Sequence, residues 1–207
     1  MRILRSPIFL FLLAVIAILL LSSIGPREQS LGVNVRIVYL HGAWVLAAEA
    51  ALGISALIGL LALLLRKAHL HAWSSALGRT GMFFWITYLP LSLWAMQANW
   101  NGLFLSEPRF RLAVIFAVTG LLLQLGLALL AHPLITSLTN LVFFITLRIG
   151  LAKAAYILHP PPSPIFSSGD LLLKLYFSLL IVLTLVAAYF MTRWWLDRRT
   201  RILRDNV

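Results

Sequence analysis

Long apolar runs separated by short polar stretches dominate the chain. A bilayer core of about 30 Å requires roughly 20 apolar residues in a helix. Six runs approach or exceed that length: Pro7–Ile24, Tyr39–Leu65, Thr80–Ala98, Leu112–Ala131, Leu134–Leu158 and Leu171–Leu196. The first run is longer than the apolar part of a signal peptide, and no A-x-A cleavage site follows it, so we interpret it as a helix. The pattern predicts an all-α integral membrane protein, a single six-transmembrane-helix bundle over residues 1–207.

Composition agrees with this class. Of the 207 residues, 61% are hydrophobic and 11% charged, and the mean hydropathy is +0.96, whereas a soluble domain carries about 25% charged residues. The absence of cysteine excludes a disulfide framework, a cysteine nucleophile and thiolate metal sites. No Walker or Rossmann pattern and no hydrolytic arrangement is visible, so we do not expect an enzyme.

The net charge of +11 is expected where lipid headgroups meet the cytoplasm, not on nucleic acid. With six spans both termini share one side, and that side has ten of the 17 basic residues: Arg2, Arg5, Arg66, Lys67, Arg79, Arg193, Arg198, Arg199, Arg201 and Arg204. Cytoplasmic loops are enriched in such residues, so we predict that both termini are cytoplasmic.

This orientation separates two kinds of loop. The cytoplasmic connections are Arg66–Arg79 and a tight turn at His132-Pro133, where the proline is a natural helix start. The external, periplasmic ones hold much of the unusual chemistry: Gly25–Val38, Asn99–Arg111 and His159–Asp170. We therefore expect the protein to act at the outer face.

Two histidines are predicted at outer helix ends. His41 opens the second span, and His159 closes the fifth, immediately before three prolines. Imidazole is a common axial ligand of haem iron, and a shared depth would let two of them ligate one flat cofactor between helices. A histidine with its polar tip among headgroups has the same pattern, so that alternative stays open.

The external loop after the third span combines aromatic rings with charge. Trp100 and Phe104 precede Glu107 and Arg109. A flat aromatic shelf beside a cation could hold a planar ligand that bears carboxylates, through stacking and charge-assisted hydrogen bonds. Tryptophan at a membrane surface is otherwise an interfacial anchor.

Arg36, Tyr39 and His41 match an R-I-x-Y-x-H stretch, and His159 with Ser163 matches L-H-x-x-x-S. In order, spacing and predicted side, these stretches resemble the haem-handling cytochrome c assembly family of membrane proteins. The likeness is greatest to its six-helix branch, the haem exporter protein C type, and it extends from about Arg36 to the last span.

That family also has an external tryptophan-rich loop, the WWD domain, reading roughly W-G-x-W-W-x-W-D-x-R. Trp100, Glu107 and Arg109 occupy its first tryptophan, its acid and its arginine, whereas Phe104 is the only other aromatic residue kept there. The WWD motif is therefore degenerate in this chain.

The resemblance implies a haem-delivery function without turnover chemistry. Haem of the b type would be a transiently bound cargo, presented to a periplasmic haem chaperone with the help of ABC transporter subunits for cytochrome c maturation. It implies iron ligands at His41 and His159, a porphyrin shelf of Trp100, Phe104 and Glu107, and propionate partners at Arg36 and Arg109. The alternatives are a b-type cytochrome subunit for electron transfer, and a small transporter or structural subunit that binds no haem.

Three further charges are predicted inside the bilayer. Glu49 lies eight residues after His41, and Arg148 and Lys153 precede His159 by eleven and six residues. At about 1.5 Å per residue, Glu49 falls at a depth between the two cations. Intramembrane charges are usually paired, so we expect Glu49 to pair with Arg148 or Lys153, unless it is protonated and hydrogen-bonded instead.

His69 and His71 are separated by one residue in the basic cytoplasmic stretch. Such spacing can bind a metal ion, but a solvated loop is the expectation here.

Overall fold

The computed structural model describes residues 6–155, 157 and 164–205, with side chains placed up to residue 198 except for that of Pro164. These residues form helices and no strand. The helices are α1 (Pro7–Ser23), α2 (Val35–Leu65), α3 (Ala68–Trp100), α4 (Pro108–Leu130), α5 (Pro133–Lys153), α6 (Pro164–Ser167) and α7 (Leu171–Asp205).

Four of the described helices are long and apolar enough to cross a membrane: α2, α4, α5 and the Leu171–Arg198 part of α7. α1 is apolar but has only 17 residues. α3 is longer, at 33 residues, but more polar, and it contains Pro90. The helical membrane class is therefore confirmed, whereas the six spans and the orientation remain predictions.

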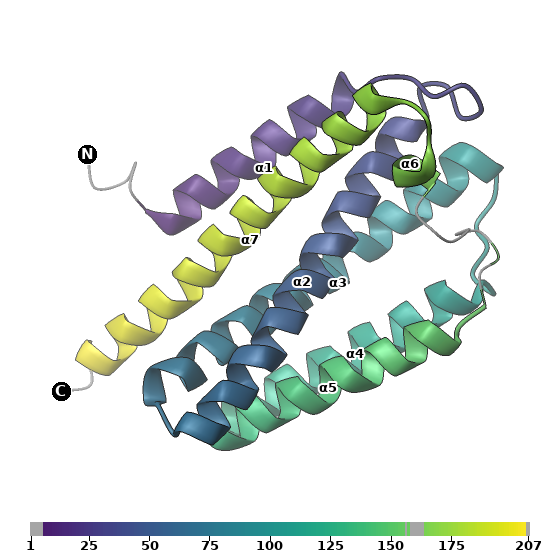
Figure 1. The fold of residues 1–207 in the computed structure, drawn as a ribbon. Helices are drawn as coiled ribbons and strands as arrows, with labels where there is room; N and C mark the ends of the chain where they lie inside the picture. Colours follow the sequence, from purple (N-terminus) through teal and green to yellow (C-terminus); the bar gives the residue numbers. More distant parts are fainter. Residues whose placement is uncertain (1–5, 156, 158–163, 206–207) are drawn as a thin grey trace.

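α2 and α3 pack against each other in the middle of the bundle. α1 and α7 lie side by side on one flank, and α4 and α5 on the other (Figure 1). One end of the bundle, which we call the terminal end, has the start of α1, the end of α7 and the connections 66–67 and 131–132. The opposite end, which we call the loop end, has the connections 24–34 and 101–107 and the last turn of α5 (Figure 1).

The predicted cytoplasmic loop Arg66–Arg79 is wrong. Only Arg66 and Lys67 connect α2 to α3, with Arg66 in the left-handed conformation (φ 52°). Residues 68–79 are helical because they contain no proline and because their polar groups are satisfied by neighbouring helices. Hydropathy alone cannot recognise such a segment.

A buried polar cluster explains this helical extension. The Ser55 hydroxyl donates to the Ser74 carbonyl oxygen (2.7 Å), and Ser74 donates in return to that of Ser55 (3.0 Å). The Asn140 amide donates to the Ser74 carbonyl oxygen (3.1 Å). His71, expected in solvent, is only 4% exposed, and its Nδ1 lies 2.7 Å from the Ser137 hydroxyl. The cluster ties α3 to α2 and α5, as interhelical polar bonds do in membranes. The described residues contain no group of three or more metal-ligating acidic or histidine side chains.

The fifth span was predicted to reach Leu158, but α5 ends at Lys153. Ala154 is extended (φ −71°, ψ 132°), although its N–H still bonds the Gly150 carbonyl oxygen. The apolar residues that follow have the hydropathy of a span without being helical at Ala154 and Ala155. α5 therefore ends six residues before the position of His159 in the sequence.

Candidate functional site

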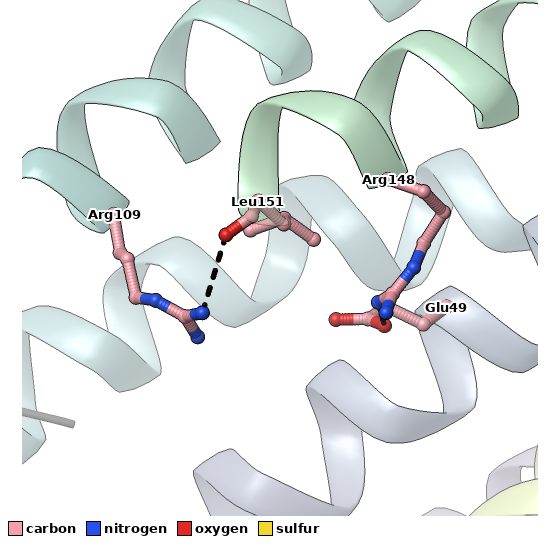
Figure 2. Close-up of polar contacts among 4 residues, drawn as sticks. All are labelled: Glu49, Arg109, Arg148 and Leu151. Atoms are coloured by element: carbon pink, nitrogen blue, oxygen red, sulfur yellow. Dashed lines mark hydrogen bonds and ion pairs between the residues drawn. The ribbon is translucent and has the colours of Figure 1, made fainter. Parts of the chain in front are cut away.

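The predicted intramembrane ion pair is present. Arg148 Nη1 donates to Glu49 Oε2 at 2.5 Å, which joins α5 to α2 (Figure 2). The Glu49 side chain is 26% exposed and that of Arg148 is 52% exposed. Lys153, the other predicted partner, is exposed at the end of α5 and is not the partner of Glu49. The pair connects the helix that carries His41 to the helix that precedes His159.

Arg109 fixes the start of α4 against the last turn of α5. Its Nη2 donates to the Leu151 carbonyl oxygen at 3.3 Å (Figure 2). The carbonyl groups in the last turn of a helix lack intrahelical partners, and an arginine satisfies one of them here.

Glu107 is not placed as a surface shelf residue. It is 3% exposed and is the N-cap of α4, where its Oε2 accepts the Phe110 N–H. A carboxylate in this position satisfies an otherwise unpaired helix donor. The structure therefore corrects the predicted shelf role: Glu107 sets where α4 begins, and thereby where Arg109 projects.

The aromatic part of the predicted shelf is at the surface. Trp100 ends α3 and is 40% exposed, and Phe104 is 41% exposed. Leu103 and Leu105 beside it are more than half exposed. Asn101 reverses the chain in the left-handed conformation (φ 50°). Connection 101–107 thus presents an apolar, partly aromatic surface at the loop end.

Arg36 and Tyr39 hold the connection between α1 and α2. Arg36 Nε donates to the Gly25 carbonyl oxygen (2.9 Å). The Tyr39 hydroxyl donates to the Pro26 carbonyl oxygen (3.4 Å). Tyr39 is fully buried and packs against Tyr176 of α7 with ring centroids 5.2 Å apart. Both residues of the matched motif therefore position the first turns of α2.

His41 lies in the second turn of α2, because that helix begins four residues earlier than predicted. Its ring is partly buried, and its centroid lies 5.6 Å from that of Tyr88 in α3. His159 lies outside the described residues, so the predicted pairing of the two histidines is not tested.

Two asparagines missed in the sequence bring the site segments together. The Asn34 amide donates to the Ala98 carbonyl oxygen (2.7 Å), and the Asn99 amide donates to the Asn34 carbonyl oxygen (3.5 Å). The first contact places the start of α2 beside the end of α3. An asparagine at each of two helix–loop junctions was the available signal, because this side chain often bonds nearby backbone.

Comparisons with family models, curated proteins and solved structures found no match to this chain.

The Glu28 carboxylate holds a turn in the connection between α1 and α2. Glu28 accepts the N–H groups of Ser30 and Leu31, both at 2.9 Å, and the Ser30 hydroxyl. The Ser30 hydroxyl first, and then the backbone bonds, lower the pKa of Glu28. Gly32 closes the turn at φ +58° and exchanges backbone bonds with Glu28.

A depressed pKa means that the Glu28 carboxylate stabilises this turn above the unfolded pKa, and that this contribution is lost as the pH falls through the folded pKa. We expect the Leu31 amide resonance to titrate with a midpoint below about 4.3, the ordinary glutamate value. NMR titration of the detergent-solubilised protein measures it. Ser30→Ala should raise the midpoint, and Glu28→Gln should abolish the transition. A wild-type midpoint at or above the ordinary value contradicts the prediction.

Proposed function

We propose that this chain binds b-type haem as a transient cargo at the loop end and presents it to a periplasmic haem chaperone for cytochrome c maturation. One observation carries the proposal. The Asn34–Ala98 contact holds the His41-bearing start of α2 beside the end of α3, from which the exposed Trp100–Phe104 surface continues. An imidazole and an aromatic surface at one end of a bundle are the elements that a haem-presenting site requires.

The described residues suggest distinct roles. His41, with His159, would ligate iron, and Trp100 and Phe104 would stack on the porphyrin. Arg36 and Arg109 would bond the propionates, since a guanidinium suits carboxylates. Both arginines already bond backbone carbonyl oxygens, which places their side chains at the loop end. Glu107 would act indirectly by capping α4.

The proposed arrangement in the cell has six spans and both termini in the cytoplasm of a prokaryote. The loop end then faces the periplasm, where the chaperone is located. ABC transporter subunits would be the partners inside the membrane and on the cytoplasmic side.

One observation favours a second candidate, a b-type cytochrome subunit. His41 is six residues inside α2, about 9 Å along the helix from its start, and its ring is partly buried against Tyr88. Haem ligated within the bundle would be held permanently and would serve electron transfer.

An absorption spectrum of the purified full chain, before and after haem addition, tests the proposal. We expect a Soret band in the wild type, lost or shifted in His41→Ala and in His159→Ala. His69→Ala, an exposed histidine at the terminal end, is the matched control and should leave the band unchanged. No Soret band, or the same band in every variant, would contradict haem ligation at the loop end.

The transfer step is tested separately with a haem-scavenging apoprotein in excess. A delivery protein should lose its haem to the scavenger within minutes, whereas a b-type cytochrome should retain it. Retention would favour the second candidate.

A further inference from the structure

A cavity of about 380 Å³ lies at the terminal end, away from the candidate haem site. Four helices line it: α3, α4, α5 and α7. Within the described part of the chain α4 and α7 do not contact each other, and both pack against α3. The cavity therefore lies against α3 and between α4 and α7, and no contact between those two helices closes it on that side.

The polar side of the cavity is cationic. Arg79 lies over the Trp195 ring, 5.5 Å from its centroid, and Arg198 lies over the Trp194 ring at 4.9 Å. Stacking on an aromatic face holds a guanidinium group in a fixed orientation. No acidic side chain of the described residues is part of the lining. The arrangement favours an anionic ligand.

Additional donors accompany the two arginines. Trp195 Nε1 is buried and makes no hydrogen bond in the described structure. A buried donor without a partner costs free energy, and the ring that carries it forms part of the cavity wall. Ser75 adds a hydroxyl group to the same lining. This set of donors suits the oxygens of a phosphate group, which arginine can bind through two parallel bonds.

The opposite side of the cavity is apolar and continues along α4. Leu127 and Ala128 line the cavity. Leu125 and Leu121, one and two turns back along α4, are 55% and 46% exposed. Residues four apart share a helix face, so these leucines extend an apolar stripe away from the cationic side. A ligand that fits both parts is an amphiphile.

The level of the cavity agrees with a headgroup. Arg198 lies 27 residues after Leu171 in α7, about 40 Å along the helix, which exceeds the roughly 30 Å of a hydrocarbon core. Basic pockets between membrane helices at this level take anionic lipid headgroups.

We propose that this cavity binds one anionic phospholipid. Its phosphate contacts Arg79 and Arg198, and its acyl chains follow the Leu121–Leu125 face of α4. This site is independent of haem handling and would anchor the ends of α3 and α7 to the lipid surface.

Native mass spectrometry of the detergent-solubilised full chain tests the proposal, with phosphatidylglycerol and phosphatidylcholine of identical acyl chains as probes. We expect one phosphatidylglycerol retained per chain, and weaker retention of phosphatidylcholine. Arg79→Gln with Arg198→Gln should weaken phosphatidylglycerol binding at least about tenfold. Arg66→Gln, an exposed arginine at the same end outside the lining, should not change it. Equal retention of the two lipids, or no effect of the double variant, would overturn the proposal.

Two further measurements address folding and the kind of ligand. Ser75→Glu adds a negative charge to the lining and keeps both arginines, so it should weaken phosphatidylglycerol binding without depending on the double variant's stability. Glycerol 3-phosphate should not displace the lipid at equal concentration, because it has no acyl chains. Displacement would show a site for free phosphate esters and would overturn the lipid assignment, as would unchanged binding in Ser75→Glu.

Discussion

Replacing Glu49 by alanine is expected to destabilise the bundle by about 3 kcal/mol. The substitution leaves Arg148 without its partner within an apolar helix, and an unpaired arginine inside a bilayer costs about 2.5–3.5 kcal/mol. The loss is similar to that of breaking a buried ion pair in a soluble protein, about 3–5 kcal/mol. The same change also removes a direct tie between α2 and α5.

A double-mutant cycle with Arg148→Ala measures the coupling. Unfolding of the reconstituted protein should give a single-variant loss for each residue and a double variant that is less destabilised than their sum by about 1 kcal/mol or more. Lys153→Ala, on the same helix, is the matched control and should be additive with Glu49→Ala. Additivity of Glu49→Ala with Arg148→Ala would show that the contact does not contribute to stability.

Gly59→Leu is expected to destabilise the protein by about 3 kcal/mol, at the upper end of the cost of overpacking. A Cβ at Gly59 would lie 2.9 Å from the Ser137 backbone oxygen and equally close to the Ser74 hydroxyl oxygen. The backbone oxygen cannot move as a side chain can, so α2 would have to separate from α5. Small residues at helix contacts in membranes allow this close approach.

Gly126 is the matched control, since a Cβ there would meet nothing within 4 Å. Gly126→Leu should be neutral, or stabilising by up to about 1 kcal/mol through helix propensity. Thermal unfolding in detergent compares the two variants, with Gly59→Ala expected between them. Equal unfolding temperatures for Gly59→Leu and Gly126→Leu would mean that the close approach at Gly59 does not limit packing.

Hydropathy located the helices but not their ends. All six predicted spans overlap helices, namely α1 to α5 and α7, but their ends differ from those of the helices, since lipid solubility does not determine where a backbone turns. The turn at His132-Pro133 was predicted from proline chemistry, and His132 indeed caps α5 by accepting the Ile135 N–H (3.4 Å). The helical start of α3 was missed because its polar side chains bond to other helices, which no local pattern reveals.

The part of the candidate site that depends on the pairing of opposite charges was predictable from the sequence. Glu49 and Arg148 were expected to pair from their depths, although the count from His159 assumed a helix that ends earlier. The two side chains still meet, because α2 begins and α5 ends at different levels of the bundle. The cap role of Glu107 and the contact of Asn34 with Ala98 depend on the packed connections at the loop end, and a motif comparison could not distinguish a cap from a shelf.

The length of α3 has a mechanical consequence. Its 33 residues extend about 50 Å, roughly 20 Å more than a hydrocarbon core. One continuous rod therefore joins the basic end of the molecule to Trp100 on the opposite side, with a single compliant point at Pro90, where a backbone hydrogen bond is lost. Tilting such a rod about its middle moves its two ends in opposite directions, so that a displacement at the terminal end would be transmitted to the aromatic surface at the loop end.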